Sequence, residues 1–389
     1  MLRVLFAVLL VHASPPLWAA QPSPRAVDVT APDGAALKAT YYAAAGPGPA
    51  VVLLHMCNAT RESWDPVGRG LSAAGIHALA LDYRGYGDSP GERHGTLPVP
   101  KRQALVTETW PGDVDAALAY LQSQPGVDKT RVGAAGGSCG VQQAVQLAGR
   151  HPDVRSLVLL AGGTDRAGLD FLHATRWLPV FTAAAADDQY DSQAPQLMKW
   201  LAELSGNPRN RFTGFADGRH GTEIFAPHPE LVTAIVEWYV DTLDRAPAAP
   251  GTAVSPGTTP ATEFWSALHG PGGVARAVQL FRDARRRDQK AFLFPEGVMN
   301  QVAYERLQAG ETKDAIEIFK LIVEAYPASA NAQDSLGDGY LAAGQNDLAL
   351  AASRRSLEML AADSANEQLK EAIRQSAQQK IDKLSPDRK

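Results

Sequence analysis

Short apolar runs alternate with amphipathic segments over residues 26–244. Val51–Leu54 is apolar without interruption, as expected of a parallel strand that is buried on both faces. The segment 64–74 has apolar residues at helical spacing and ends before Gly75, a typical helix C-cap. Because strands and helices alternate in this way, we predict an α/β fold in which a mostly parallel sheet carries helices on both faces. Further strands are expected at 27–30, 36–42, 77–82, 131–135, 156–160, 179–184 and 211–215, and further helices at 113–122, 141–149, 195–204 and 229–243.

The composition changes after this region. Residues 245–261 are rich in Pro, Ala, Gly, Thr and Ser, which predicts a linker. From 262 to 389 the apolar residues recur with a helical period throughout, so we expect an all-α C-terminal domain. Within it the segments 296–329 and 330–363 have equal length and align with each other, which indicates two repeats of one helical unit.

The N-terminus has the pattern of a secretory signal over residues 1–20. Arg3 supplies a positive start, Val4–Val11 is an apolar stretch too short to span a bilayer, and the small residues Ala19 and Ala20 follow. No later apolar stretch approaches the length of a membrane helix, so we expect no membrane span in the mature chain. The pattern predicts export, to the periplasm or out of the cell.

Composition and charge narrow the functional classes. The chain has 389 residues, of which 45% are hydrophobic and 20% charged, values typical of a globular protein with room for two domains. Its net charge is -5 and it has no basic stripe, so nucleic-acid binding is not expected. Histidines and acidic residues show no cluster at metal-ligand spacing, and we expect neither a metal nor an organic cofactor.

A candidate nucleophile lies in the sequence Gly136-Gly137-Ser138-Cys139-Gly140. This G-x-S-x-G motif follows a predicted strand and begins a predicted helix, the setting in which a serine sits on a sharp turn. The helix N-terminus would place a positive dipole beside the serine. The alternative is a Gly/Ser turn in a nucleotide-binding fold, but no lysine or acid stands nearby at the spacing that phosphate or ribose binding requires. We therefore take Ser138 as the candidate nucleophile.

A serine needs a general base, and the base needs an orienting acid. Asp188 follows the predicted strand 179–184 and is preferred to its neighbours Asp187 and Asp191. His220 lies between glycines in a loop after the last predicted strand, and it is preferred to His228, which begins the last helix of this region. The sequence therefore predicts a Ser138, Asp188 and His220 triad.

The stabilisation of an oxyanion needs two backbone N–H donors. One candidate is Cys139, directly after the nucleophile, and the other is Met56 or Cys57 in the loop after Leu54. Cys57 and Cys139 are the only cysteines of the chain, and they fall on the two halves of this expected oxyanion hole. A disulfide between them is reasonable in an exported protein, and two buried free thiols are the alternative.

Residues 26–244 resemble the α/β-hydrolase superfamily, and within it the dienelactone hydrolase-like group. The resemblance is carried by Leu53-Leu54-His55, the segment Asp82–Ser89, the Ser138 motif, Asp188 and Gly218–Gly221. It implies the hydrolysis of an ester, thioester or amide of a small-molecule or acyl substrate through an acyl-enzyme. A serine peptidase of the same fold is an alternative. Dienelactone hydrolases use a cysteine nucleophile, whereas the register here places Ser138 at that position.

The two helical repeats of the C-terminal region carry characteristic residues. They are Ala315, Phe319 and Pro327 in the first repeat and Leu336, Gly337 and Tyr340 in the second. With these residues the region resembles the tetratricopeptide repeat (TPR). Such repeats commonly bind a peptide or a protein, so the resemblance implies a partner, and an alternative is a scaffold protein whose hydrolase domain is inactive. In a third interpretation these helices only pack on the hydrolase or mediate self-association.

Few segments of the sequence could form a lid over the expected site. Few residues separate the predicted strands 156–160 and 179–184, where a large cap is usually inserted in this superfamily, so we expect an open site. The longest rim segment is 87–112, with Arg93, His94 and Trp110. It is either a solvated loop or a substrate-contacting one.

Overall fold

The computed structural model describes residues 22–247, 249, 251, 255 and 257–385. The predicted signal sequence, residues 1–20, lies outside these residues, as does part of the predicted linker. Within the described residues, no helix is long and apolar enough to cross a membrane.

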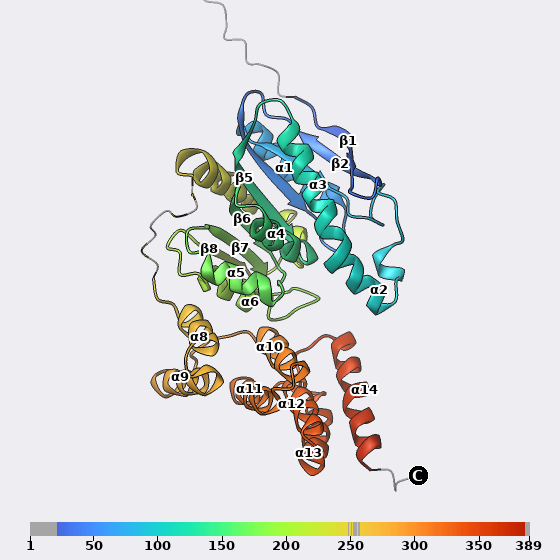
Figure 1. Cartoon of the computed structure of the whole chain (residues 1–389), viewed down its shortest axis with the longest axis vertical. Coiled ribbons are helices and arrows are strands. Elements are labelled where there is room, and N and C mark those ends of the chain that lie inside the picture. Colours follow the sequence, from blue (N-terminus) through green and yellow to red (C-terminus); the bar gives the residue numbers. More distant parts are fainter. Residues whose placement is uncertain (1–21, 248, 250, 252–254, 256, 386–389) are drawn as a thin grey trace, which may run out of the picture.

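An eight-stranded sheet forms the centre of the molecule (Figure 1). The strand order is β1-β2-β4-β3-β5-β6-β7-β8. Strand β2 is antiparallel to both of its neighbours, β1 and β4, and the six strands β4, β3, β5, β6, β7 and β8 are parallel to one another. The prediction of a mostly parallel sheet is thus confirmed. The strands are β1 (Arg25–Thr30), β2 (Ala36–Tyr42), β3 (Gly48–Leu54), β4 (His77–Leu81), β5 (Val127–Gly137), β6 (Val154–Leu160), β7 (Val180–Ala185) and β8 (Arg211–Phe215).

Two apolar clusters cover the two faces of this sheet. Successive side chains of a strand point to opposite faces, so Val51 and Leu53 join one cluster while Val52 and Leu54 join the other. The first cluster is completed by α1 (Asp65–Ala73) and α7 (Pro229–Tyr239). The second is completed by α3 (Trp110–Ser123), α4 (Cys139–Arg150), α5 (Arg166–Ala174) and α6 (Ala194–Glu203).

The C-terminal region is helical, and its helices lie together at the bottom of Figure 1. The two segments predicted as repeats each form one helix pair, with 13 residues in the first helix and 14 in the second. Gly310 and Gly344 occupy equivalent turns, and both have positive φ. Membership of the TPR family stays a prediction. The helices are α8 (Pro260–His269), α9 (Gly273–Arg287), α10 (Glu296–Gln308), α11 (Thr312–Ala325), α12 (Ala330–Ala342), α13 (Asn346–Met359) and α14 (Glu367–Leu384).

The helical region shares a hydrophobic core with the eight-stranded sheet. Phe264 and Trp265 of α8 belong to the same buried cluster as Met198 and Trp200 of α6. The ring centroids of Trp200 and Trp265 are 5.6 Å apart, and the Trp200 indole N–H donates to the Leu293 carbonyl at 2.8 Å. These contacts favour the interpretation in which the C-terminal helices pack on the hydrolase.

The rim segment 87–112 is largely helical, and its aromatic residues are not equivalent. Trp110 is fully buried and stacks on the Tyr83 ring at a centroid distance of 4.3 Å, so it is a core residue and cannot contact substrate. Arg93 is exposed, and His94 is half-buried against Trp110. The segment contains a short helical turn at His94–Thr96, the helix α2 (Val99–Ala104) and a wider turn at Leu105–Thr109.

Candidate active site

Ser138 occupies a strained turn between β5 and α4. Its φ of 51° and ψ of -120° are unfavourable for a residue with a side chain, and such strain is characteristic of functional sites. A Cβ atom on Gly136 would collide with the Gly140 carbonyl, and one on Gly140 would collide with the Leu54 carbonyl. The two glycines of the motif are therefore required by the close approach of backbone to backbone. The Ser138 N–H donates to the Leu160 carbonyl at 2.9 Å, which fixes the turn against β6.

His220 and Asp188 form a buried hydrogen-bonded pair. The His220 Nδ1–H donates to Asp188 Oδ2 at 2.7 Å, while Asp188 Oδ1 accepts the N–H groups of Tyr190 at 2.9 Å and Asp191 at 3.0 Å. Burial raises the pKa of the Asp188 carboxyl, but the hydrogen bond and charge of His220 and the two backbone donors outweigh it, so the pKa lies below its ordinary value. With Nδ1 protonated in this way, His220 Nε2 is available as a proton acceptor.

The residues that were alternatives for this pair have other partners. Asp187 is exposed and accepts the Arg219 N–H at 2.8 Å. His228 bonds to Asp217 and Glu230, each at 3.0 Å. The structure therefore pairs His220 with Asp188 and places His228 elsewhere.

The His220 loop and the Ser138 turn lie against the same side chain, Met56. A Cβ on Gly137 would lie 3.0 Å from Met56 Cγ, and one on Gly221 would collide with the Met56 sulfur. The Thr222 N–H also donates to that sulfur, at 3.3 Å. Among the described residues no hydrogen bond joins Ser138 to His220, and catalytic hydrogen bonds of this type are often long before substrate binds. Met56 thus holds the two loops side by side.

The two segments expected to form the oxyanion hole are joined covalently. Cys57 and Cys139 form a disulfide, with their Cα atoms 5.8 Å apart. The Cys139 N–H is in the first turn of α4, where a backbone N–H has no partner within the helix. The Cys57 carbonyl is held by the Tyr86 hydroxyl at 2.8 Å, and the Met56 carbonyl by His55 Nδ1–H at 2.6 Å. Both donor segments are therefore held in place by several bonds.

His55, which the resemblance placed at the start of this loop, has a structural role. Its ring is fully buried; Nδ1–H donates to the Met56 carbonyl, and Nε2 accepts the Tyr83 N–H at 3.1 Å. One ring nitrogen donates and the other accepts, which is possible only if the imidazole is neutral. Burial lowers the pKa of His55 to about 4, against the opposing effects of the Met56 carbonyl and Asp82.

The folded protein is expected to lose stability as the pH falls from 6.5 toward about 4, partly through His55. In this range the unfolded chain binds a proton on His55 that the folded protein does not, so the free energy of unfolding falls by about 1.4 kcal/mol per pH unit. Thermal unfolding of the wild type and His55→Gln across this range measures the effect. The variant should be less stable near neutral pH but should show the shallower pH dependence. If the free energy of unfolding changed equally with pH in the two proteins, His55 would not be the group responsible.

No local sequence pattern indicated that Asn58, Tyr190 and Asn366 lie together beside the candidate site. The Tyr190 ring packs edge-on against His220 at a centroid distance of 4.8 Å, and its hydroxyl accepts Asn58 Nδ2–H at 3.3 Å. Asn366, the N-cap of α14, donates through Nδ2 to the Tyr190 carbonyl at 3.0 Å. Tyr190 and Asn366 are 176 positions apart, so no local motif could have linked them.

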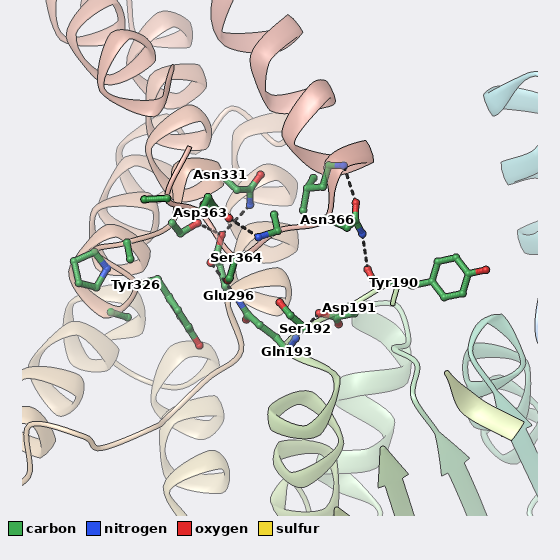
Figure 2. Close-up of a pocket in the computed structure, with 17 residues that line it drawn as sticks. Tyr190, Asp191, Ser192, Gln193, Glu296, Tyr326, Asn331, Asp363, Ser364 and Asn366 are labelled. Atoms are coloured by element: carbon green, nitrogen blue, oxygen red, sulfur yellow. Dashed lines mark hydrogen bonds between the residues drawn. The ribbon is translucent and has the colours of Figure 1, made fainter. Parts of the chain in front are cut away.

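The C-terminal helices come close to one side of the site. The connection after β6 carries only α5, so no cap is inserted there. The helical region instead reaches the loop that holds Asp188, through the Asn366 contact and a 3.4 Å hydrogen bond between Gln193 and Glu296 (Figure 2). No group of three or more His, Cys, Asp or Glu among the described residues is arranged to hold a metal ion.

Comparisons with known proteins agree with this architecture. A family model described as alpha/beta hydrolase fold matches residues 49–193. Two uncharacterized proteins of Mycobacterium tuberculosis are 33% identical over 161 residues, which is 41% of this chain and 52% of theirs. A thiohydrolase of Arthrinium phaeospermum is 31% identical over 127 residues, 32% of this chain and 39% of its own. The chain thus spans about half the length, or less, of these curated relatives.

Solved structures were also matched. An esterase of Pyrococcus furiosus is 18% identical with a TM-score of 0.46, over 57% of this chain and 91% of its own. A dienelactone hydrolase of Anabaena variabilis is 18% identical with a TM-score of 0.46, over 57% of this chain and 99% of its own. From the family model and its own sheet topology, the chain has an α/β-hydrolase fold followed by an all-helical region.

Proposed function

We propose that this protein is a serine hydrolase that cleaves a carboxylic ester, or a related thioester or amide, through an acyl-enzyme. The observation that carries the proposal is the buried hydrogen bond between His220 Nδ1 and Asp188 Oδ2, next to the strained turn of Ser138. In the proposed triad Ser138 is the nucleophile, His220 the general base and Asp188 the orienting acid.

The reaction follows from these positions. Ser138 Oγ attacks the carbonyl carbon as its proton passes to His220 Nε2, and Asp188 stabilises the imidazolium that forms. His220 then returns the proton to the leaving group, which departs from the acyl-enzyme. In the second half, His220 activates a water that attacks the acyl carbonyl, and Ser138 recovers its proton.

The oxyanion would be bound by the N–H groups of Cys139 and Cys57. The Cys139 N–H stands at the positive end of α4. The Cys57 N–H belongs to the same trans peptide as the Met56 carbonyl, and that carbonyl is held by the buried His55. Because the two groups of a trans peptide point in opposite directions, the Cys57 N–H points away from His55. This favours Cys57 over Met56 as the second donor.

The proposed destination is the periplasm or the exterior of the cell. The disulfide between Cys57 and Cys139 supports it, because disulfides persist mainly in oxidising compartments. The shared core of the sheet and the C-terminal helices supports an enzyme in which both parts act together. It does not favour a scaffold with an inactive hydrolase domain.

Covalent labelling with a fluorophosphonate tests the proposed nucleophile directly. The native protein should be labelled, and peptide mapping by mass spectrometry should place the label on Ser138. Heat-denatured protein and folded His220→Ala should remain unlabelled, because Ser138 is reactive only with its base in place. A folded wild-type protein that takes up no label would reject the serine hydrolase assignment and would leave the scaffold interpretation as the better one.

A further inference from the structure

Two adjoining cavities lie between the hydrolase sheet and the C-terminal helices. Their volumes are about 410 and about 250 Å³. Figure 2 shows the larger one, with the 190–193 segment on one side and residues of α10, α12 and the 363–366 turn on the other. We call the two together the interdomain groove. The residues that line both cavities are Asp191, Gln193, Glu296, Asn331 and Leu369.

The smaller cavity brings this groove close to the backbone of the Ser138 turn. It reaches Gly163, and the preceding Gly162 is packed so closely that a Cβ on it would collide with the Ser138 carbonyl. The larger cavity is bounded by Tyr190, whose ring points away from the other lining residues in Figure 2 and packs on His220. The groove therefore adjoins the Ser138 turn at Gly163 and the His220 ring at Tyr190.

The central side chain of the groove is Glu296, which is only 5% exposed and lines both cavities. Its Oε1 accepts the Ser329 hydroxyl at 2.8 Å and Asn331 Nδ2–H at 2.9 Å. Its Oε2 accepts Gln193 Nε2–H at 3.4 Å. These neutral donors come from both parts of the molecule, so the carboxylate is held in one orientation before any ligand binds.

The groove is lined by three carboxylates and by no basic side chain. Asp191, Glu296 and Asp363 line it, and neither cavity has a lysine or arginine among its lining residues. None of these three carboxylates has an ion pair with a lysine or arginine in the described part of the chain, whereas the buried Asp82 and Asp113 pair with arginines. A cation in the groove would be attracted by this charge, and an anion would be repelled.

We propose that the interdomain groove is the subsite for the part of the substrate beyond the scissile bond, and that it takes a positively charged amino group. The protein would then act on esters or amides of amine-bearing compounds and would discriminate against substrates with a carboxylate at that position. This inference rests on the proposed function, because it assigns the substrate class of the same Ser138 site.

Matched ester series test the assignment. In one series, p-nitrophenyl esters have acyl chains of equal length that end in an ammonium, a methyl or a carboxylate. In the other series, all esters are acetates, and their alcohol parts have equal length and end in an ammonium, a methyl or a carboxylate. In at least one series we expect kcat/KM to be about 10-fold higher for the ammonium than for the methyl ester, and lowest for the carboxylate. A flat profile or a preference for the carboxylate in both series would overturn the proposal.

Three variants connect the charge preference to the groove. Glu296→Gln removes the central charge and keeps the size of the side chain, so the ammonium-to-carboxylate ratio of kcat/KM should fall about 10-fold. Leu369→Lys adds a cation at a position that is already 43% exposed, and it should lower the same ratio. Glu317→Gln makes the same change in net charge as Glu296→Gln on an exposed part of α11 and should leave the ratio unchanged.

The outcomes separate this proposal from the one it rests on. Ser138-dependent hydrolysis of the methyl-ended esters with no effect of charge would reject the groove assignment and retain the serine hydrolase. Equal effects of Glu296→Gln and Glu317→Gln would also reject it, because the preference would then come from the net charge of the protein. Absence of hydrolysis of every ester would reject both proposals.

Discussion

The Ser138→Ala variant is expected to hydrolyse p-nitrophenyl acetate about 10⁶-fold more slowly than the wild type, and the Asp188→Asn variant about 10⁴-fold more slowly. Removal of Ser138 abolishes the acyl-enzyme route. Asparagine at 188 keeps an oxygen for the backbone N–H groups of Tyr190 and Asp191, so the loop should retain its shape. Its amide donor would face His220 Nδ1, however, and would favour the tautomer that has no free Nε2.

The pH dependence of Asp188→Asn provides a second measurement. In the wild type, burial raises the pKa of the Asp188 carboxyl, but the hydrogen bond and charge of His220 and two backbone N–H groups hold it below its ordinary value, so the carboxylate should stay ionised to below its usual pH range. As the pH falls through that lowered pKa, the wild type loses the charge that orients His220, and kcat/KM should fall. Asp188→Asn has no carboxylate at this position, so this part of the acidic loss should be absent from its pH profile.

Asp187→Asn is the matched control for Asp188→Asn. Asp187 is adjacent and exposed, and it contacts the Arg219 N–H rather than His220. Its activity should stay close to that of the wild type. Melting temperatures of all variants exclude misfolding as the cause of lost activity. Similar losses in Asp187→Asn and Asp188→Asn would contradict the triad.

Removal of the Cys57–Cys139 disulfide is expected to destabilise the protein by up to about 4.5 kcal/mol. The bridge spans 82 positions, and a loop of that size restricts the unfolded chain by about this amount. The Cys57→Ser, Cys139→Ser double variant should also have a lower kcat for a short ester, with a smaller change in KM. The physical reason is that the disulfide holds together the two segments that supply the oxyanion donors, and these donors act mainly in the transition state.

Chemical denaturation and steady-state kinetics measure the two effects separately. A reductant should reproduce both effects in the wild type and should change neither in the double variant. A double variant that is less stable but retains full kcat would show that the bridge contributes to stability alone. A double variant with unchanged stability would contradict the chain-entropy argument.

Several features of the fold followed from local patterns in the sequence. The uninterrupted apolar run Val51–Leu54 became part of the parallel strand β3, because a strand buried on both faces favours apolar side chains at successive positions. The G-x-S-x-G motif became a turn with positive φ at Ser138, because only glycine at 136 and 140 permits the close backbone contacts. These features depend on residues that are close together in the chain, so they can be predicted from the sequence.

Other features depended on packing between distant segments. Trp110 was open to a substrate-contacting role until the structure placed it against Tyr83, which is a contact no spacing rule reveals. Our proposal of Cys57 rather than Met56 as an oxyanion donor rests on the bond from His55 to the Met56 carbonyl, which no sequence pattern indicates. The short connection after β6 predicted that no large cap is inserted there, but no local pattern predicted that the C-terminal helices approach the Asp188 loop from the other end of the chain.

The sequence by itself determined the α/β class, the helical C-terminal region and the candidates Ser138, Asp188 and His220, because each follows from residue types at short spacing. Only the tertiary structure decided that Asp188 rather than its neighbours meets His220, that Cys57 is joined to Cys139, and that Asn366 supports the Tyr190 turn. It also created the interdomain groove, which exists only where the C-terminal helices meet the loops at the edge of the sheet. Such contacts arise from the packing of complete elements, and local sequence patterns do not encode which distant surfaces will face each other.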